Sequence, residues 1–291
     1  MTLEQNLSAF AAAVGADMKK RAIVHGSGPY VLDPKRTPPG EIALVPAGTT
    51  VMTHVGNRFT GATAGATPTT TTTALTGSLP FRATGATQWK FADAGLFGKS
   101  IQLTTTATAT EMMACTADLP AGTTEVQISI VCVIPEPTAD TAIIGLYRSG
   151  GGQEYRALIK PGTTAGTSQV IFDDSKTAGG WNNILPDHAS GSRLRVAIAA
   201  QIGTGSDGRQ KAAAYLVHAN GTETQIGGTY EVTGVTTPAA DVYASVNFGK
   251  LTGQASLESK VLQIDAIRVA YGPGAYDTGL LLDERRYPEA V

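Results

Sequence analysis

The sequence predicts a mainly β protein, in which an antiparallel sandwich of two sheets follows a short N-terminal α-helix and an irregular linker that contains short strands. Two observations carry this prediction. From residue 101 onward, roughly ten short apolar runs are separated by Gly, Pro and Asn turn signals, a spacing typical of sandwiches. No helical segments of 10–15 residues alternate with these runs, which argues against a parallel sheet covered by helices.

The composition agrees with this fold class. Aromatic residues make up 6% of the chain and charged residues 16%, whereas the chain holds 34 Gly and is rich in Thr. Thr favours strands and Gly favours tight turns. Because 291 residues can bury a substantial core, we expect many strands and turns around one interior.

The chain opens with a predicted helix over residues 1–21. Thr2 is followed three residues later by Gln5, which is a capping-box signature. Apolar residues then follow at spacings of four, three and four, as in a short heptad seam: Leu3, Leu7, Phe10 and Val14. An isolated helix of this length is marginal in water, so the stripe packs either on its own domain or in a bundle that joins protomers.

Residues 22–78 are expected to form an irregular connector. Pro and Gly punctuation, as in Pro38-Pro39-Gly40, leaves room only for short strands, which we expect over residues 30–32, 41–45 and 50–55. From Thr60 to Thr76, nine of seventeen residues are Thr. This stretch offers too little apolar surface to order itself, so we expect a linker, or an extended strand ordered by a partner chain.

The sandwich is predicted over residues 79–271. Its expected strands are 101–106, 110–116, 126–134, 141–148, 155–160, 169–173, 193–202, 211–218, 225–233, 242–249 and 261–271. In the last of these, alternation sets Leu262, Ile264 and Ala266 against Gln263, Asp265 and Ile267. Residues 272–291 are expected to leave the sandwich as a tail, whose leucines at 280–282 either fold back on the domain or dock on a neighbour.

The strand over residues 126–134 shows the pattern most clearly. One face is plainly core and carries Val126, Ile128, Ile130, Cys132 and Ile134. The second face starts polar and turns apolar, and carries Gln127, Ser129, Val131 and Val133. Something is expected to cover it: a neighbouring sheet, another protomer or a ligand. If the chain's own loops are the cover, we expect the ligand site elsewhere.

Charge and hydropathy exclude several partners. The net charge is −2, and no basic cluster is longer than Lys19-Lys20-Arg21, so nucleic acid is not expected. No segment approaches the ~20 apolar residues of a spanning helix, so membrane insertion is not expected. The N-terminus lacks a basic region ahead of its apolar stretch, which predicts folding in a cytosol, where Cys115 and Cys132 would stay free and buried.

Motifs for catalysis are missing from the sequence. The four histidines, His25, His54, His188 and His218, have no metal-ligand spacing, and neither a nucleophile–base motif nor a phosphate-binding loop is present. The carboxylates have no spacing that singles out a hydrolytic pair. We therefore predict no enzymatic activity, no cofactor and no metal, and keep a glycan-degrading enzyme on the same fold as an alternative.

Aromatic residues suggest a ligand instead. Sugar-binding faces present flat rings beside planar polar groups. One sequence neighbourhood offers both, and we take as candidate glycan-binding residues Tyr147, Arg148, Tyr155, Trp181, Asn182 and Asn183. The alternative is that Trp181, like Trp89, fills the core.

The N-terminal stretch TLEQNLSAFAAAVGADMKKR, and within it Val14-Gly15-Ala16-Asp17 with Lys19, resembles the openings of minor tail proteins from bacteriophages of actinobacteria. The body from about Trp89 to Tyr271, with its closing strand LQIDAIRVAYG, is similar to concanavalin-type jelly rolls. The resemblance implies a structural protein of the virion tail, a fibre or tip component, assembled in the host cytoplasm. The N-terminal helix would then serve in oligomerisation or virion attachment.

The partners implied by this resemblance are further copies of the chain in a homotrimer, other virion tail proteins, and a host cell-wall or surface polysaccharide bound by the sandwich. Two alternatives stay open: a glycan-degrading tail enzyme on the same fold, and a head-decoration or head-fibre protein.

Overall fold

The computed structural model describes residues 30–32, 44–46, 53–57, 59, 61–68, 81–83, 89–105, 111–117, 122–137, 141–148, 153–173, 183–202, 208–235, 242–250 and 260–279. The chain divides into two compact units, Met1–Val51 and Met52–Val291. In the first unit, β1 (Tyr30–Leu32) pairs antiparallel with β2 (Leu44–Pro46). The helix expected over residues 1–21, with its stripe Leu3, Leu7, Phe10 and Val14, lies outside the described residues and stays a prediction.

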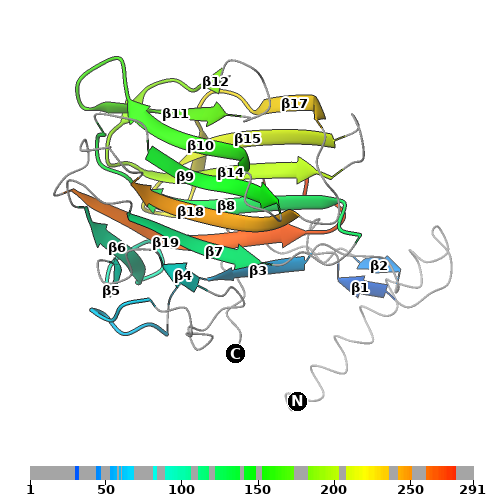
Figure 1. Ribbon diagram of the computed structural model, residues 1–291, viewed down its shortest axis with the longest axis horizontal. Helices are drawn as coiled ribbons and strands as arrows, with labels where there is room; N and C mark the ends of the chain where they lie inside the picture. The colour runs from blue at the N-terminus through cyan, green and yellow to red at the C-terminus, as the bar shows by residue number, and fades with distance from the viewer. Residues whose placement is uncertain are drawn as a thin grey trace, which may run out of the picture. The chain divides into compact units, whose positions relative to one another are not determined.

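The second unit is an antiparallel sandwich of two sheets, so the predicted fold class is confirmed (Figure 1). In one layer, called the β9 sheet, the strands follow the order β12 (Asn183–Ile184), β11 (Thr167–Asp173), β10 (Gln153–Pro161), β9 (Thr141–Arg148), β18 (Val242–Lys250), β7 (Glu111–Ala117) and β4 (Phe81–Ala83), and β13 (His188–Ala189) pairs with β11.

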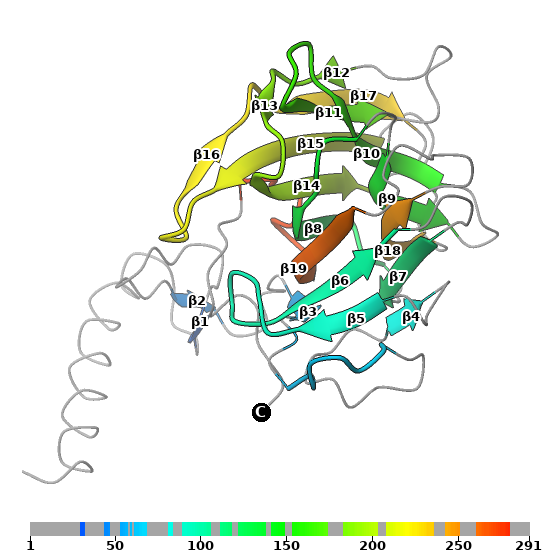
Figure 2. The same ribbon diagram turned by 90° about the vertical axis from the view of Figure 1, so that its left-hand side faces the viewer.

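In the other layer, called the β8 sheet, the order is β16 (Glu223–Gln225), β15 (Gly208–Val217), β14 (Arg193–Gln201), β8 (Glu125–Val133), β19 (Val261–Tyr271), β6 (Ser100–Thr104) and β5 (Trp89–Ala92). β17 (Tyr230–Val235) pairs with β15, and β3 (Thr53–Asn57) pairs with β19. Figure 2 shows the two layers after a quarter turn, with β15, β14, β8 and β19 side by side.

The core lies between the two sheets and follows the alternation of the strands. In β8, Val126, Ile128, Ile130 and Cys132 point inward and are fully buried, as predicted. The β9 sheet contributes side chains such as Ile159 and Phe172 to the same core. Burying a large aliphatic or aromatic side chain stabilises a fold by about 1.5–3 kcal/mol, so these rows hold the layers together.

Cys132 is a free thiol in this core, as predicted. Its pKa is raised well above the ordinary value, first by burial and then by the charge of Asp265. Cys115 lies in β7 of the opposite sheet.

Two strand predictions need correction. The strand expected over 225–233 is split into β16 and β17, because Gly227 takes a positive φ of 63° and a Cβ there would meet Pro186. In β19 the register shifts between Ile264 and Ala266. This bulge turns Ile267 inward and Ala266 outward, opposite to the faces expected from simple alternation.

Part of the Thr-rich segment also packs on the sandwich. The amide of Gly65 donates to the carbonyl of Phe91, and the amide of Phe91 donates to Ala66, at 2.8 and 3.0 Å. Phe59, in a left-handed conformation with φ of 64°, is fully buried beside Phe91 at a ring separation of 6.1 Å. Residues 61–68 are therefore ordered by this chain's own β5.

Candidate functional site

The outward face of the β8 sheet carries an array of polar side chains. Strand pairing aligns four strands in three rows: Tyr215, Arg195, Val131 and Ala266; then Ala213, Ala197, Ser129 and Arg268; then Lys211, Ala199, Gln127 and Ala270. All are buried except Lys211, which is half-buried. Alanines form much of the floor, and the polar groups stand among them.

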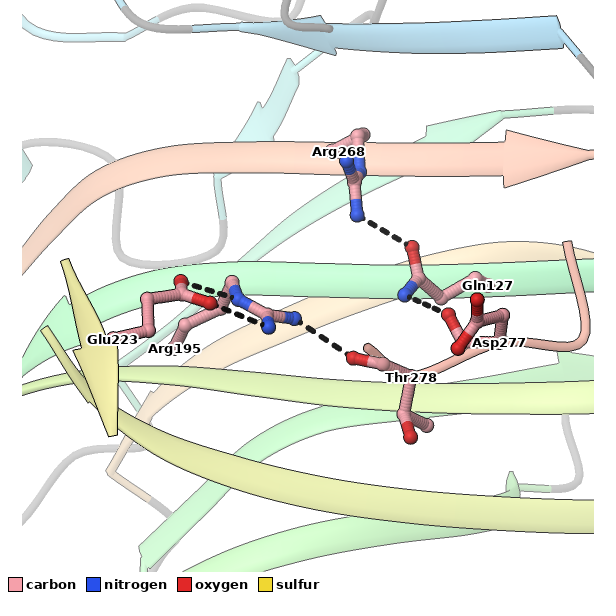
Figure 3. Close-up of polar contacts among 6 residues, drawn as sticks. All are labelled: Gln127, Arg195, Glu223, Arg268, Asp277 and Thr278. Carbon is pink, nitrogen blue, oxygen red and sulfur yellow. Dashed lines mark hydrogen bonds and ion pairs between the residues drawn. The ribbon is translucent and has the colours of Figure 1, made fainter. Parts of the chain in front are cut away.

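Arg195 is the most heavily bonded member of this array. Its Nε and Nη2 donate to the two carboxylate oxygens of Glu223 on β16, at 2.6 and 2.8 Å (Figure 3). Its Nη1 donates to the carbonyl of Thr278 at 3.0 Å, and its guanidinium carbon lies 4.0 Å from the ring centre of Tyr215. Such a planar, two-pronged pair fixes the direction of the guanidinium on the sheet.

Gln127 links the array to a neighbouring strand. Its Oε1 accepts a hydrogen bond from Nη2 of Arg268 at 2.8 Å, and its Nε2 donates to the carbonyl of Asp277 at 2.7 Å (Figure 3). Arg268 and Gln127 are both fully buried. The amide is thereby oriented with its donor group toward the chain that crosses above the sheet.

Ser129 lies between these two groups of contacts. In the sheet it pairs with Ala197 on β14 and with Arg268 on β19. Its hydroxyl is fully buried and has no hydrogen-bond partner within the part of the chain that the structure describes. A buried hydroxyl without a partner costs free energy, so such a group in a polar array points to a ligand that completes it.

The cover of this face comes from the chain itself. Residues 272–279, called the strap, follow β19 and cross the outward face, where their carbonyls meet Gln127 and Arg195. At the opposite end of the face, Leu96 and Phe97 pack on Val131 and Ala266. The face predicted to need a cover is therefore covered by the chain's own segments, and by the expectation stated above the ligand site would lie elsewhere.

The polar array argues against placing the site elsewhere. A permanent cover would be expected to bury apolar side chains, because buried charges and amides are costly unless paired. Here guanidinium, amide and hydroxyl groups line the interface instead. Guanidinium and amide donors directed at an oxygen suit carboxylate and hydroxyl groups of a ligand. We therefore take the array, and not the aromatic neighbourhood, as the candidate site.

Four of the six sequence-predicted ligand residues lie in the other sheet. Tyr147 and Arg148 lie in β9, where they pair with Tyr243 and Val242 of β18. Tyr155 lies in β10, and Asn183 pairs with Phe172 at the edge strand β12. These four belong to the β9 sheet. Trp181 and Asn182 lie outside the described residues.

The array escaped the sequence analysis for a local reason. Alternation places Gln127 and Ser129 on the outward face of their strand. It places Arg268, however, on the same side as the core residues Leu262 and Ile264. Only the bulge in β19 moves Arg268 outward. A charged residue at a strand position where alternation predicts an apolar one is a sequence signal for such a bulge.

A second polar cluster anchors the turn between β10 and β11. The carboxylate of Asp187 accepts hydrogen bonds from the amide and hydroxyl of Thr163 and from the hydroxyl of Thr167, at 2.6–3.0 Å. These bonds, led by that of the Thr163 hydroxyl, lower the pKa of Asp187. Burial lowers the pKa of the adjacent His188, against the opposing charge of Asp187. The bonds of Asp187 go to this turn and to Gln169 in the adjoining β11, so we assign the cluster a structural role.

Among the described residues, no three metal-binding side chains converge, and no helix is long and apolar enough to span a membrane.

Comparison with known proteins identifies the fold. No family model and no curated protein matches the sequence. Among solved structures, alginate lyase Aly36B covers 77% of this chain and 98% of its own, with 14% identity and a TM-score of 0.50. A mutant of the same enzyme bound to an alginate trisaccharide covers 74% and 97%, with 13% identity and a TM-score of 0.50. A lyase from Aplysia kurodai covers 72% and 99%, with 8% identity and a TM-score of 0.48.

The two likenesses at a TM-score of 0.50 show a shared sandwich fold, and they contradict the expectation that the chain is not an enzyme. That expectation rested on missing nucleophile motifs and carboxylate pairs. Lyases cleave by proton abstraction and elimination, which needs neither a nucleophilic side chain nor a hydrolytic carboxylate pair. Missing motifs of those two kinds therefore gave no ground for excluding catalysis on this fold.

Proposed function

We propose that the chain is a polysaccharide-degrading enzyme of the eliminating type, acting on an acidic glycan at the outward face of the β8 sheet. The observation that carries the proposal is the polar array of Gln127, Ser129, Arg195 and Arg268 on that face. It is polar where a purely structural surface of this kind would be apolar, and it includes a buried hydroxyl for which the described residues provide no partner.

The chemistry of elimination fits the residue types in the array. In a uronate sugar, the proton beside the carboxylate becomes removable only when the negative charge of that carboxylate is neutralised. Arg268 and Gln127 supply a cation and an amide donor for this purpose. Tyr215 and Lys211, on the adjacent strand, are side chains of the types that accept or return a proton in such steps.

The solved structures support the proposal at the level of fold. Two structures that share the sandwich at a TM-score of 0.50 are of alginate lyase Aly36B, one of them a mutant with an alginate trisaccharide bound. Alginate and other uronate-containing glycans are therefore the first substrates to test.

The test is an assay of the purified chain with soluble alginate, other uronate polysaccharides and neutral glucans. Elimination produces a new carbon–carbon double bond, so ultraviolet absorbance and reducing ends should rise together with a uronate polymer and not with a neutral one. The proposal fails if no uronate polymer is cleaved or bound by the full chain or by Tyr276→Ala, a variant that loosens the strap.

Ser129→Ala is the sharpest variant for this site. Because the Ser129 hydroxyl has no partner among the described residues, its removal is not expected to lower stability. Loss of one hydrogen bond to the ligand should lower kcat/KM by about 2- to 10-fold. Ser100→Ala is the matched control, since Ser100 is also fully buried, its hydroxyl also has no partner in the described ranges, and it lies on β6 outside the array.

We also propose, on the N-terminal resemblance alone, that the enzyme is carried on a bacteriophage tail as a homotrimer. The segment Val14-Gly15-Ala16-Asp17 supports this placement, and a glycan-degrading domain would suit a tail that meets a cell-wall polysaccharide. Fractionation of virions tests the placement: the protein should follow tails, and recovery on tailless capsids would contradict it.

A further inference from the structure

The strap occupies the site in the way that a ligand would. We propose that residues 272–279 form a displaceable cover, which holds the polar array in a closed state until an acidic polysaccharide takes the place of its backbone carbonyls. This inference rests on the proposed function, because it concerns the regulation of the same site.

The start of the strap is built to reverse the chain. Gly272 and Gly274 have φ of 97° and 90°, a left-handed region that glycine adopts without strain. The amide of Gly272 donates to the carbonyl of Glu125 at 2.9 Å, and the amide of Ala275 donates back to Gly272 at 3.0 Å. This tight turn sends the chain from the end of β19 back over the face of the same sheet.

The strap is held mainly by polar contacts. Oε2 of Glu125 accepts from the amides of Gly274 and Tyr276, at 2.5 and 3.1 Å. The Tyr276 hydroxyl donates to Glu231 at 2.8 Å, and the Lys211 ammonium lies 4.1 Å from the centre of the Tyr276 ring. These contacts lie at the rim of the array, where Glu231 is exposed.

Apolar attachment of the strap is small. Among the described residues, the fully buried hydrophobic cluster that joins the strap to the sheet consists of Ala275 and Ala270. Segments held by few apolar contacts open locally at a free energy far below that of global unfolding. The strap is therefore suited to leave the face while the sandwich stays folded.

Over the array, two backbone carbonyls of the strap accept hydrogen bonds. The carbonyl of Asp277 accepts from Gln127, and the carbonyl of Thr278 accepts from Arg195 (Figure 3). Carboxylate and hydroxyl oxygens of a sugar are acceptors of the same kind, and a carboxylate makes stronger bonds to a guanidinium than a neutral carbonyl does. In the closed state the strap thus meets the Gln127 and Arg195 donors with neutral oxygens, and the Ser129 hydroxyl has no partner among the described residues.

The test loosens the strap at its rim and leaves the array intact. Tyr276→Ala removes the hydrogen bond to Glu231 and the ring beneath Lys211. We expect alginate to bind this variant about 10-fold more tightly than it binds the wild-type chain, measured by affinity electrophoresis or calorimetry. Asp93→Ala is the control: it breaks the ion pair with Lys99 in the segment at the opposite end of the same face and should leave affinity unchanged.

Hydrogen exchange gives a second, independent measurement. The amides of Gly274 and Tyr276 should exchange faster than those of β14 in the free protein, and faster still when alginate is added. Equal alginate affinity of wild type and Tyr276→Ala, or strap amides that exchange only with global unfolding, would overturn the inference even where the enzyme proves active. If neither protein binds a uronate polymer but the strap amides exchange early, the proposed function fails while the strap remains an openable segment.

Discussion

Arg195 shows how a single residue combines structure and function on the outward face. It is fully buried, and its charge is met by Glu223, whose side chain is 6% exposed. Breaking a buried pair of this kind costs about 3–5 kcal/mol, because the remaining charge is left without compensation. Substitutions of Arg195 or Glu223 are thus expected to unfold the protein before they report on a ligand, whereas Ser129 and Tyr276 allow cleaner tests.

His188 should make stability depend on pH. Burial lowers its pKa below the ordinary value of 6.5, so the folded state holds it neutral where the unfolded chain takes up a proton. The free energy of unfolding is therefore expected to fall as pH decreases below 6.5, and His188→Gln should flatten this slope. The pKa of Asp187 lies below 3.8, so its contribution is lost only in more acidic solution.

Urea unfolding at a series of pH values checks this prediction. His218→Gln is the control for the substitution itself, because His218 is exposed. An unchanged pH dependence in His188→Gln would show that another group causes the acid destabilisation.

Cys132 should be chemically inert in the folded protein. Its full burial excludes reagents, and its raised pKa keeps the thiol protonated at neutral pH. In a Cys115→Ser background, which leaves this thiol alone, we expect labelling by iodoacetamide only at the rate of unfolding. Fast labelling without denaturant would contradict the burial of Cys132, and the urea-unfolded chain provides the reference rate.

At the scale of elements, the β8 sheet is shaped by its irregularities. The bulge in β19 places Asp265 where its carboxylate accepts from Nε of Arg193 at 2.5 Å and from Nε2 of Gln263 at 2.6 Å. The segment between β5 and β6 lies over this bulge, and its Gly95 lies close to the side chain of Asp265. The bulge thus turns Arg268 into the array. It also lies where the segment between β5 and β6 covers the end of the outward face.

Gly95→Ala tests this closure. A Cβ at Gly95 would collide with the carbonyl of Lys99 and lie 2.8 Å from Oδ1 of Asp265, in a backbone with φ of 120°. We expect a loss of about 2–3 kcal/mol in the free energy of unfolding, as strain and collision add. Gly98→Ala is the matched control: it has a φ of 85° but no atom within 4 Å, so only the strain of about 1 kcal/mol should appear. Equal losses in the two variants, measured by chemical denaturation, would count against the contact.

At the scale of the whole molecule, the described sandwich and the proposed trimer depend on different parts of the chain. The polar array and the strap lie within Met52–Val291, whereas the predicted heptad stripe lies within Met1–Val51. Glycan binding and assembly should therefore be separable by substitution.

Light scattering tests this separation. The chain has a mass of 30.0 kDa, and we expect the wild type to show three times that mass. Leu7→Asp should give the monomer, because a charge in a short apolar seam removes the packing that joins the helices. Its sandwich should keep the same alginate affinity. A wild-type protein of monomer mass would remove the helix from any role in assembly.

Local pattern determined the strands of this protein. The ranges predicted for Thr141–Arg148 and Val261–Tyr271 coincide with β9 and β19, because alternation of side chains is a property of each strand by itself. The same alternation assigned Cys132 to the core and left Gln127 and Ser129 facing outward.

The site was decided only by the tertiary structure. Arg195, Ser129 and Arg268 belong to three strands that are neighbours through long-range pairing, and Arg268 faces outward only because of a one-residue bulge. The strap completes the array from residues 272–279, a stretch that local pattern assigned to a tail outside the sandwich. Register and chain reversal depend on contacts between distant residues, so the sequence by itself determined which strands form, and the folded chain decided which of their polar groups meet.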